Sequence, residues 1–158
     1  MFLCKISWCI ITSDWNDRGE FKISTLEELE QILDRFEEQH QGNKASIVQI
    51  FLPSGTYMMV GLGHHHQLSC LSYVSPHDSF CPCRIGIGDK NDKSKEVIEF
   101  LYGNQTEEFR KRESIPKEIA RRAVRYFVQT GGELTDEVTW DTDLEKPDQN
   151  DIDYDGPF

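Results

Sequence analysis

Residues 115–134 read IPKEIARRAVRYFVQTGGEL, and this stretch predicts an amphipathic helix with a defined start and end. Pro116 suits the first turn of a helix, where a missing N–H costs little. Gly131 and Gly132 are expected to end the helix, because glycine readily adopts the left-handed conformation found at helix termini. Apolar side chains recur at helical spacing on one face: Ile119, Ala120, Ala123, Val124 and Phe127. The helix therefore needs an apolar partner surface elsewhere in the chain.

A second helix is predicted from residue 25 to about residue 40. Ser24 and Thr25 precede Glu27 and Glu28 in a capping-box pattern, which satisfies backbone donors at a helix start. The apolar residues again share one face: Leu26, Leu29, Ile32, Leu33 and Phe36. Gly42 is expected to close this helix.

Most other apolar segments have the composition of β-strands. The strand candidates are residues 2–11, 45–52, 57–62, 68–74, 83–87 and 97–102, with Val138 and Trp140 in a short last extended segment. Pro53-Ser54-Gly55 predicts a hairpin turn, and the polar segments 13–19 and 107–114 are expected to be loops. This order predicts a single α+β domain, in which an antiparallel sheet of about five to six strands packs against two main helices on one face.

The 158 residues are strongly acidic, with a net charge of −11 and a pI of about 4.8. This charge argues against direct binding of nucleic acid, which needs clustered lysine and arginine, and against anionic membrane surfaces. It permits a basic protein partner. From Asp141 onward seven acids face one lysine, so the segment carries −6 and the preceding body −5. We therefore expect a folded domain over residues 1–141 and an acidic tail over residues 142–158.

Several features fit a cytoplasmic protein. No stretch approaches the roughly 20 apolar residues of a membrane span, and the start of the chain has neither a basic leader nor a cleavage site. The chain has five cysteines, and an odd number without a signal peptide indicates reduced thiols.

Candidate catalytic and metal sites do not form coherent patterns. His64–His66 lie near Cys70, Cys81 and Cys83 in the sequence, but Cys81 and Cys83 are separated by one residue and lack the second matched pair of a structural zinc site. A Cys70 nucleophile with His66 or His77 is conceivable, although cysteines in apolar runs are usually core residues. The paired glycines at 61–63 and 86–88 lack the continuation of a phosphate-binding loop. We expect no catalytic residue, no metal and no cofactor.

Acidic and aromatic residues are the better candidates for a binding surface. Trp15 lies in a polar segment between Asp14 and Asp17, and an exposed tryptophan ringed by acids suits a protein interface. Spaced carboxylates of the tail can occupy a basic groove in place of phosphates. The candidate contacts in this second group are Asp141, Asp143, Glu145, Asp151 and Asp153.

The stretch 115–134 together with Val138-Thr139-Trp140 resembles the C-terminal signature of the first immunity-protein family of bacterial polymorphic toxin systems. The matching features are an Ile-Pro opening, an alanine-containing helix, a phenylalanine, a Thr-Gly stop and a closing tryptophan. These signature residues are Pro116, Ala120, Ala123, Phe127, Gly131 and Trp140. Thr135 departs from the pattern, because the family often has proline there, and the three histidines and the acidic tail are not part of it.

The resemblance implies an immunity protein without enzymatic activity that binds a cognate toxin and covers its active site. In many cases such a toxin is a deaminase or nuclease, and an enzyme that handles nucleic acid tends to have a basic cleft. The signature describes scaffold residues, so it implies no contact residues, and the oligomeric state stays open. Two alternatives remain: an enzyme that depends on cysteine, histidine or a metal, and a generic acidic regulatory module.

Overall fold

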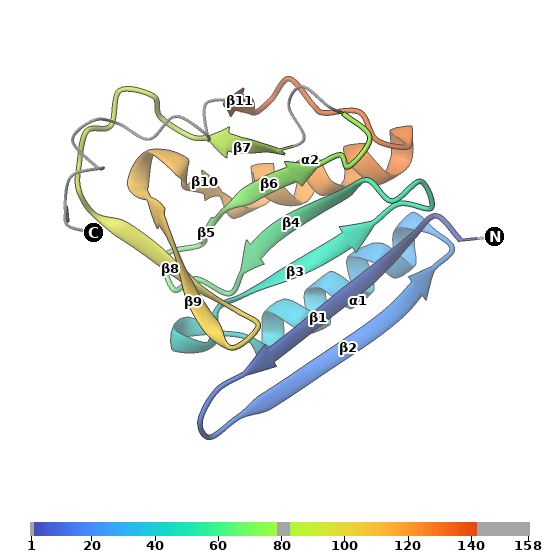
Figure 1. Ribbon diagram of the computed structural model, residues 1–158, viewed down its shortest axis with the longest axis horizontal. Coiled ribbons are helices and arrows are strands. Elements are labelled where there is room, and N and C mark those ends of the chain that lie inside the picture. Colours follow the sequence, from blue (N-terminus) through green and yellow to red (C-terminus); the bar gives the residue numbers. More distant parts are fainter. Residues whose placement is uncertain (1, 79–82, 142–158) are drawn as a thin grey trace.

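The computed structural model describes residues 2–78 and 83–141, which form an α+β domain built on one large sheet (Figure 1). The main sheet contains β1 (Cys4–Ile11), β2 (Asn16–Ile23), β3 (Ser46–Phe51), β4 (Tyr57–Leu62), β6 (Leu71–Val74), β7 (Cys83–Ile87), β8 (Val97–Tyr102), β9 (Gln105–Arg110) and β11 (Thr139–Asp141). A separate pair joins β5 (Leu68–Ser69) to β10 (Ile115–Pro116). The helices are α1 (Leu26–Gln39) and α2 (Lys117–Thr130), with short 3-10 turns η1 (Gly42–Lys44) and η2 (Lys111–Glu113).

The sheet follows the order β11-β7-β6-β4-β3-β1-β2, and the hairpin β8–β9 branches from β3. Neighbouring strands are antiparallel except for β3 and β8, which pair in parallel at Ser46 and Leu101. The predicted α+β class with an antiparallel sheet and two helices is confirmed. The sheet has nine strands in the described residues, more than the five to six expected.

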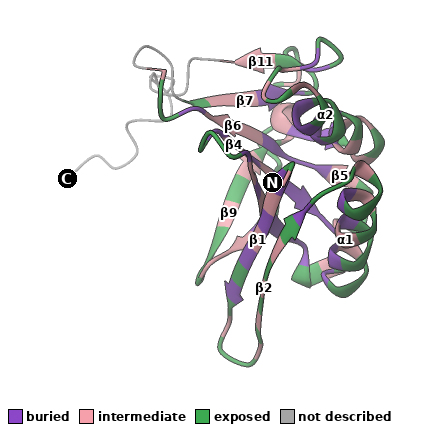
Figure 2. Ribbon diagram, turned by 90° about the vertical axis from the view of Figure 1, so that its right-hand side faces the viewer, coloured by how far each residue is buried: buried purple, intermediate pink, exposed green. Residues whose placement is uncertain are grey.

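Both helices pack on the same face of the sheet (Figure 2), as their apolar faces require. Leu29, Leu33 and Phe36 of α1 are fully buried, as are Ala120 and Phe127 of α2. They meet the inward side chains of the central strands in the main hydrophobic cluster. Within the described residues, no helix is long and apolar enough to cross a membrane.

Local interactions fix the ends of both helices. The backbone N–H of Glu28 donates to Thr25 Oγ1 over 3.1 Å, while Glu28 Oε1 accepts from the Thr25 N–H over 3.1 Å, so the predicted capping box is confirmed. Gly131 ends α2 with a φ of +74°, in the left-handed region that favours glycine. The prediction that Gly42 closes α1 is wrong, because the helix ends at Gln39 and His40 caps it.

The expected loop over residues 13–19 is wrong, because most of it belongs to β2. This strand is polar and lies at the edge of the sheet, so it lacks the apolar alternation of a strand that is covered on a face. Gly19 leaves room for Trp8, the residue that it faces in the pairing with β1. A Cβ at this position would lie 2.4 Å from the Trp8 ring, which crosses the strand.

The expected loop over residues 107–114 is also wrong, because Gln105–Arg110 forms β9 and η2 follows it. The sequence of β9 did not predict a strand because it contains adjacent glutamates and little apolar alternation. Among its larger side chains, only Glu107 and Phe109 turn inward. The predicted strand over residues 68–74 is confirmed in part. It divides at Cys70 into β5 and β6.

Candidate functional site

The hairpin β8–β9 lies on the face of the sheet opposite the helices (Figures 1 and 2). A small second hydrophobic cluster supports it, formed by Ala45, Ile47, Cys70, Ile98 and Phe100. Two backbone bonds of 2.8 Å tie it to the sheet, from the Leu101 N–H to the Ala45 carbonyl and from the Ile11 N–H to the Gly103 carbonyl. Gly61 makes room for this arrangement, because a Cβ there would lie 2.7 Å from the Phe100 ring. The hairpin is therefore held at a fixed position against the sheet.

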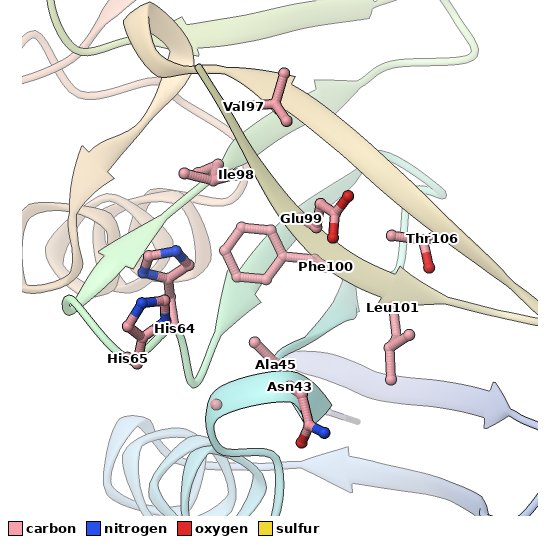
Figure 3. Close-up of a pocket in the computed structure, with 11 residues that line it drawn as sticks. Asn43, Ala45, His64, His65, Val97, Ile98, Glu99, Phe100, Leu101 and Thr106 are labelled. Atoms are coloured by element: carbon pink, nitrogen blue, oxygen red, sulfur yellow. The ribbon is translucent and has the colours of Figure 1, made fainter.

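A groove runs between β8 and the segment His64–His66. One part has a volume of about 580 Å³ and extends to η1, and an adjoining part of about 530 Å³ extends to Lys111. Figure 3 shows Ile98 and Phe100 extending from β8 toward His64 and His65, with Glu99 and Thr106 on the opposite side of the strand. The groove thus has an apolar floor, imidazoles on one wall and the strand β8 on the other.

The three histidines form a cluster of rings on this wall. The His64 and His65 rings stack with centroids 4.6 Å apart, and His64 Nδ1 accepts a hydrogen bond of 3.1 Å from the His66 N–H. Burial, and then the neighbouring imidazoles, lower the pKa of His64 below its ordinary value. His64 is therefore neutral at neutral pH, and the cluster adds polarity to the groove without a fixed positive charge at this position.

Three carboxylates on the helix side of the molecule are paired with cations. Arg121 lies 2.7 Å from Glu30, 2.9 Å from Asp34 and 3.3 Å from Glu37. Lys117 adds a contact of 2.7 Å to Glu37, and Arg125 adds one of 3.3 Å to Glu30. Three of the six acidic residues of α1 are thus paired with cations of α2, while Glu27, Glu28 and Glu38 are exposed and have no ion pair within the described residues.

Carboxylates on the hairpin are not compensated in this way. Glu99 of β8 and Glu108 of β9 are directly opposite each other in the strand register, and both are exposed. Neither has an ion pair within the described residues, and like charges at such a position repel. Glu96 at the start of the hairpin is different, since Lys111 lies 3.4 Å from it. The uncompensated charge of the hairpin therefore lies on its outward face.

The structure places the predicted contacts Asp14, Trp15 and Asp17 at the turn between β1 and β2. Asp14 is exposed and accepts from Thr12 Oγ1 over 3.2 Å. Trp15 is half-buried, with the Lys44 ammonium 4.9 Å from its ring centroid. Asp17 faces inward and accepts from the Trp8 indole N–H over 2.9 Å. The three residues are close in sequence but only Asp14 presents its side chain freely to solvent.

Asp17 belongs to a buried polar group around His40. The His40 Nδ1 lies 2.7 Å from the Phe36 carbonyl, and Nε2 lies 2.9 Å from Asp17 Oδ2 as an ion-pair contact rather than an aligned hydrogen bond. Burial lowers the pKa of His40, although both contacts oppose that shift. This group connects the end of α1 to the edge of the sheet.

The other predicted binding residues lie at the C-terminal end. Asp141 ends β11, and Arg112 lies 3.3 Å from its carboxylate. The remaining four predicted contacts, Asp143, Glu145, Asp151 and Asp153, lie outside the described residues, as does the tail 142–158. The signature residues Ala120, Ala123 and Phe127 are buried on α2, Pro116 precedes the helix and Gly131 ends it. The Trp140 indole N–H donates to the Thr135 carbonyl over 3.0 Å.

The cysteines and histidines do not come together as a catalytic or metal site in the described part of the chain. Cys70 is buried in the second cluster, and this burial raises the pKa of its thiol, which disfavours the thiolate that a nucleophilic cysteine needs. His77 instead contacts the Ser54 carbonyl through Nε2 over 2.9 Å. Among residues 2–78 and 83–141, no three His, Cys, Asp or Glu side chains are placed to hold a metal ion. Cys81 lies outside these ranges.

Sequence reasoning missed the groove and the facing pair Glu99 and Glu108. The strand over residues 97–102 was predicted, and the outward position of Glu99 follows from its alternation. Its partner strand was expected to be a loop, so the opposition of the two carboxylates could not be foreseen. The dipeptide Gly103-Asn104, directly after a predicted strand, was the available signal for a hairpin turn.

Comparison with known proteins identifies the family. The family model of Immunity protein Imm1 matches residues 17–142, which is well over half of the chain. The match includes all of β2 except its first residue, both helices, the hairpin β8–β9 and the closing tryptophan strand. A search of the curated proteins finds no match. The extent of the family match shows that the chain belongs to the Imm1 immunity protein family, whose members act against bacterial toxins.

Proposed function

We propose that this immunity protein binds a cognate toxin that acts on nucleic acid, a deaminase or a nuclease, and neutralises it by covering its active site. The proposal needs no chemistry from the immunity protein. It requires an acidic surface that fits a basic cleft, since an enzyme that handles nucleic acid tends to have such a cleft. We further propose that this happens in the cytoplasm.

The observation that carries the proposal is the unequal compensation of charge on the two sides of the domain. Glu30, Asp34 and Glu37 of α1 are paired with cations of α2, whereas Glu99 and Glu108 on the opposite side have no ion pair in the described residues. Surfaces of opposite charge on two proteins accelerate their association and disfavour partners of the wrong charge. The outward face of the hairpin thus supplies the negative surface that the proposal needs.

The turn between β1 and β2 is a second candidate contact region. Asp14 is exposed there, whereas Trp15 and Asp17 also take part in packing and hydrogen bonding within the domain. We propose Asp14 and Trp15 as peripheral contacts. Substitutions of Asp17 would test folding as much as binding, because Trp8 and His40 both depend on it.

Co-expression with the toxin encoded by the adjacent gene tests the proposed function. We expect the full chain to rescue growth and to purify as a complex with the toxin. Absence of both the complex and the rescue would refute the proposal. A complex that forms while the toxin keeps its activity on nucleic acid would refute the covering of the active site.

Salt dependence tests the electrostatic part separately. The association rate with a catalytically inactive toxin should fall markedly as ionic strength rises from about 0.01 M to about 0.15 M, since the screening length shortens from about 30 Å to about 8 Å. A rate that stays constant would contradict steering by the acidic surface. The same measurement on a chain that lacks residues 143–158 separates the contribution of the tail to the association rate from that of the domain.

A further inference from the structure

The strand β8 has an open backbone edge along the groove. In an antiparallel pair, only every second residue of a strand forms backbone hydrogen bonds with the partner strand. The Lys111 N–H donates to the Glu96 carbonyl over 3.0 Å, and the register places Ile98 and Phe100 two and four residues after Glu96, at the same kind of hydrogen-bonded position. The N–H groups of Val97, Glu99 and Leu101 therefore point away from β9. The Leu101 N–H confirms this direction, since it bonds the Ala45 carbonyl.

Only Leu101 of these three finds a strand partner. The parallel contact between β3 and β8 consists of Ser46 and Leu101, because β3 begins where β8 is already near its end. The N–H groups of Val97 and Glu99 have no backbone partner in the described part of the chain. Both residues line the groove, so their unpaired groups face a space large enough to admit another chain.

We propose that an extended segment of the toxin adds to β8 in this groove as a further strand. This is strand addition, in which main-chain hydrogen bonds give affinity and alternate side chains give specificity. The inference rests on the proposed function only for the identity of the occupant. The groove, the open edge and the charge are features of this chain alone.

The chemistry of the two faces of β8 defines the segment that fits. Side chains on one face of the added strand lie beside Ile98, Phe100 and the His64 ring, which is an apolar and polarisable surface. Side chains on the other face lie beside Val97 and Glu99, and Val97 is 46% exposed. The fitting segment therefore alternates apolar residues with lysine or arginine.

A cation beside Glu99 also relieves a feature of the free protein that is otherwise unfavourable. Glu99 and Glu108 oppose each other across the hairpin and have no ion pair with any residue that the structure describes, and Arg110 lies two residues further along the same face. A basic side chain of the toxin placed next to Glu99 lowers the repulsion between the two carboxylates. The charge of the groove thus favours a toxin segment over a second copy of this acidic chain.

The two glutamates provide a matched pair of variants for the test. Glu99→Pro and Glu108→Pro each remove one carboxylate and one N–H that takes no part in the β8–β9 ladder. Proline is tolerated where a strand's N–H faces away from its partner. Only the Glu99 N–H faces the groove, and Glu99→Gln removes the charge while keeping the donor.

Binding to the catalytically inactive toxin of the adjacent gene is then measured with the full chain. We expect Glu99→Pro to bind at least about tenfold more weakly, because it loses both a main-chain bond and a charge contact. Glu108→Pro should stay within about twofold of the unmodified chain, and Glu99→Gln should lie between them. Equal losses for the two proline variants would overturn the strand addition.

Amide hydrogen exchange of the unmodified chain gives a second readout that no folding defect can disturb. The amides of Val97 and Glu99 should exchange rapidly in the free chain and become protected in the complex, while the Glu108 amide stays rapid. A complex that leaves Val97 and Glu99 unprotected overturns this inference and leaves the proposed function intact. Protection in the isolated chain at high concentration, with a doubled mass, makes the groove a contact between two copies and also overturns it. Absence of any complex overturns both proposals.

Discussion

Arg121 is the position at which removal of one charge should cost the most stability. Its side chain is 15% exposed and reaches three carboxylates of α1, at 2.7, 2.9 and 3.3 Å. Arg121→Met keeps most of the aliphatic stem and removes the charge. Loss of one partner from a buried ion pair costs about 3–5 kcal/mol, whereas exposed pairs contribute about 0–1 kcal/mol. Two of the three acids retain a second cation, Glu37 with Lys117 and Glu30 with Arg125.

We therefore expect Arg121→Met to lower the free energy of unfolding by about 2 kcal/mol, between those two limits. Arg125→Met is the matched control, one helical turn away, with a side chain 48% exposed and one contact at 3.3 Å. Its cost should stay below about 1 kcal/mol. Urea unfolding followed by circular dichroism measures both free energies. The dependence of the unfolding free energy on urea concentration should be the same for both variants, which shows that they share a similar denatured state. Equal losses for the two variants would refute the view that Arg121 is the centre of the contact between the helices.

Three further predictions concern the capping box, the support of the hairpin and the buried histidine. Thr25→Ala should lower the unfolding free energy by about 1 kcal/mol and Thr25→Ser by much less, as measured by urea unfolding, because only alanine removes the acceptor for the first turn. Gly61→Ala should cost about 1–3 kcal/mol by overpacking and weaken toxin binding, since its Cβ meets the Phe100 ring at 2.7 Å and Cys70 Sγ at 2.8 Å; adding Cys70→Ala should restore part of both losses. Burial holds the native pKa of His40 below its ordinary value of 6.5, so the unfolded chain binds more protons just below that pH, and stability should fall as pH drops through this window. In His40→Gln the unfolding free energy should change less between pH 7 and pH 5. An unchanged slope would mean that other groups cause the pH dependence.

The helices were predictable because each carries its own start, stop and apolar face. The capping residues Thr25 and Glu28 and the terminal Gly131 act within a few positions of the sequence, so no tertiary contact is needed to recognise them. The strands β4, β7 and β8 were predicted with the bounds they have, since apolar runs bounded by turn residues define them. The end of α1 was predicted to within about one residue, but its capping residue was not, because His40 has no terminator pattern and is fixed by a tertiary contact to Asp17.

The edge strands and the groove could not be predicted for a related reason. β2 and β9 expose most of their side chains, so polar residues suffice in them and no apolar alternation marks the strand. The groove is formed by segments more than 30 residues apart, His64–His66 and β8, and depends on where β3 begins relative to β8. Such a register offset is a property of the folded sheet. The candidate contacts at Asp14 and Trp15 followed from local composition alone, and they remain predictions.

The division of the interior into two hydrophobic clusters has a consequence for how specificity is acquired. The helices and the central strands share one cluster, while the hairpin β8–β9 rests on the smaller one around Ile98 and Phe100. Sub-global opening of the hairpin should therefore require less free energy than global unfolding. Substitutions on its outward face can alter the proposed partner surface while leaving the scaffold's main cluster unchanged. An immunity protein built in this way is able to follow changes in its toxin without refolding its core.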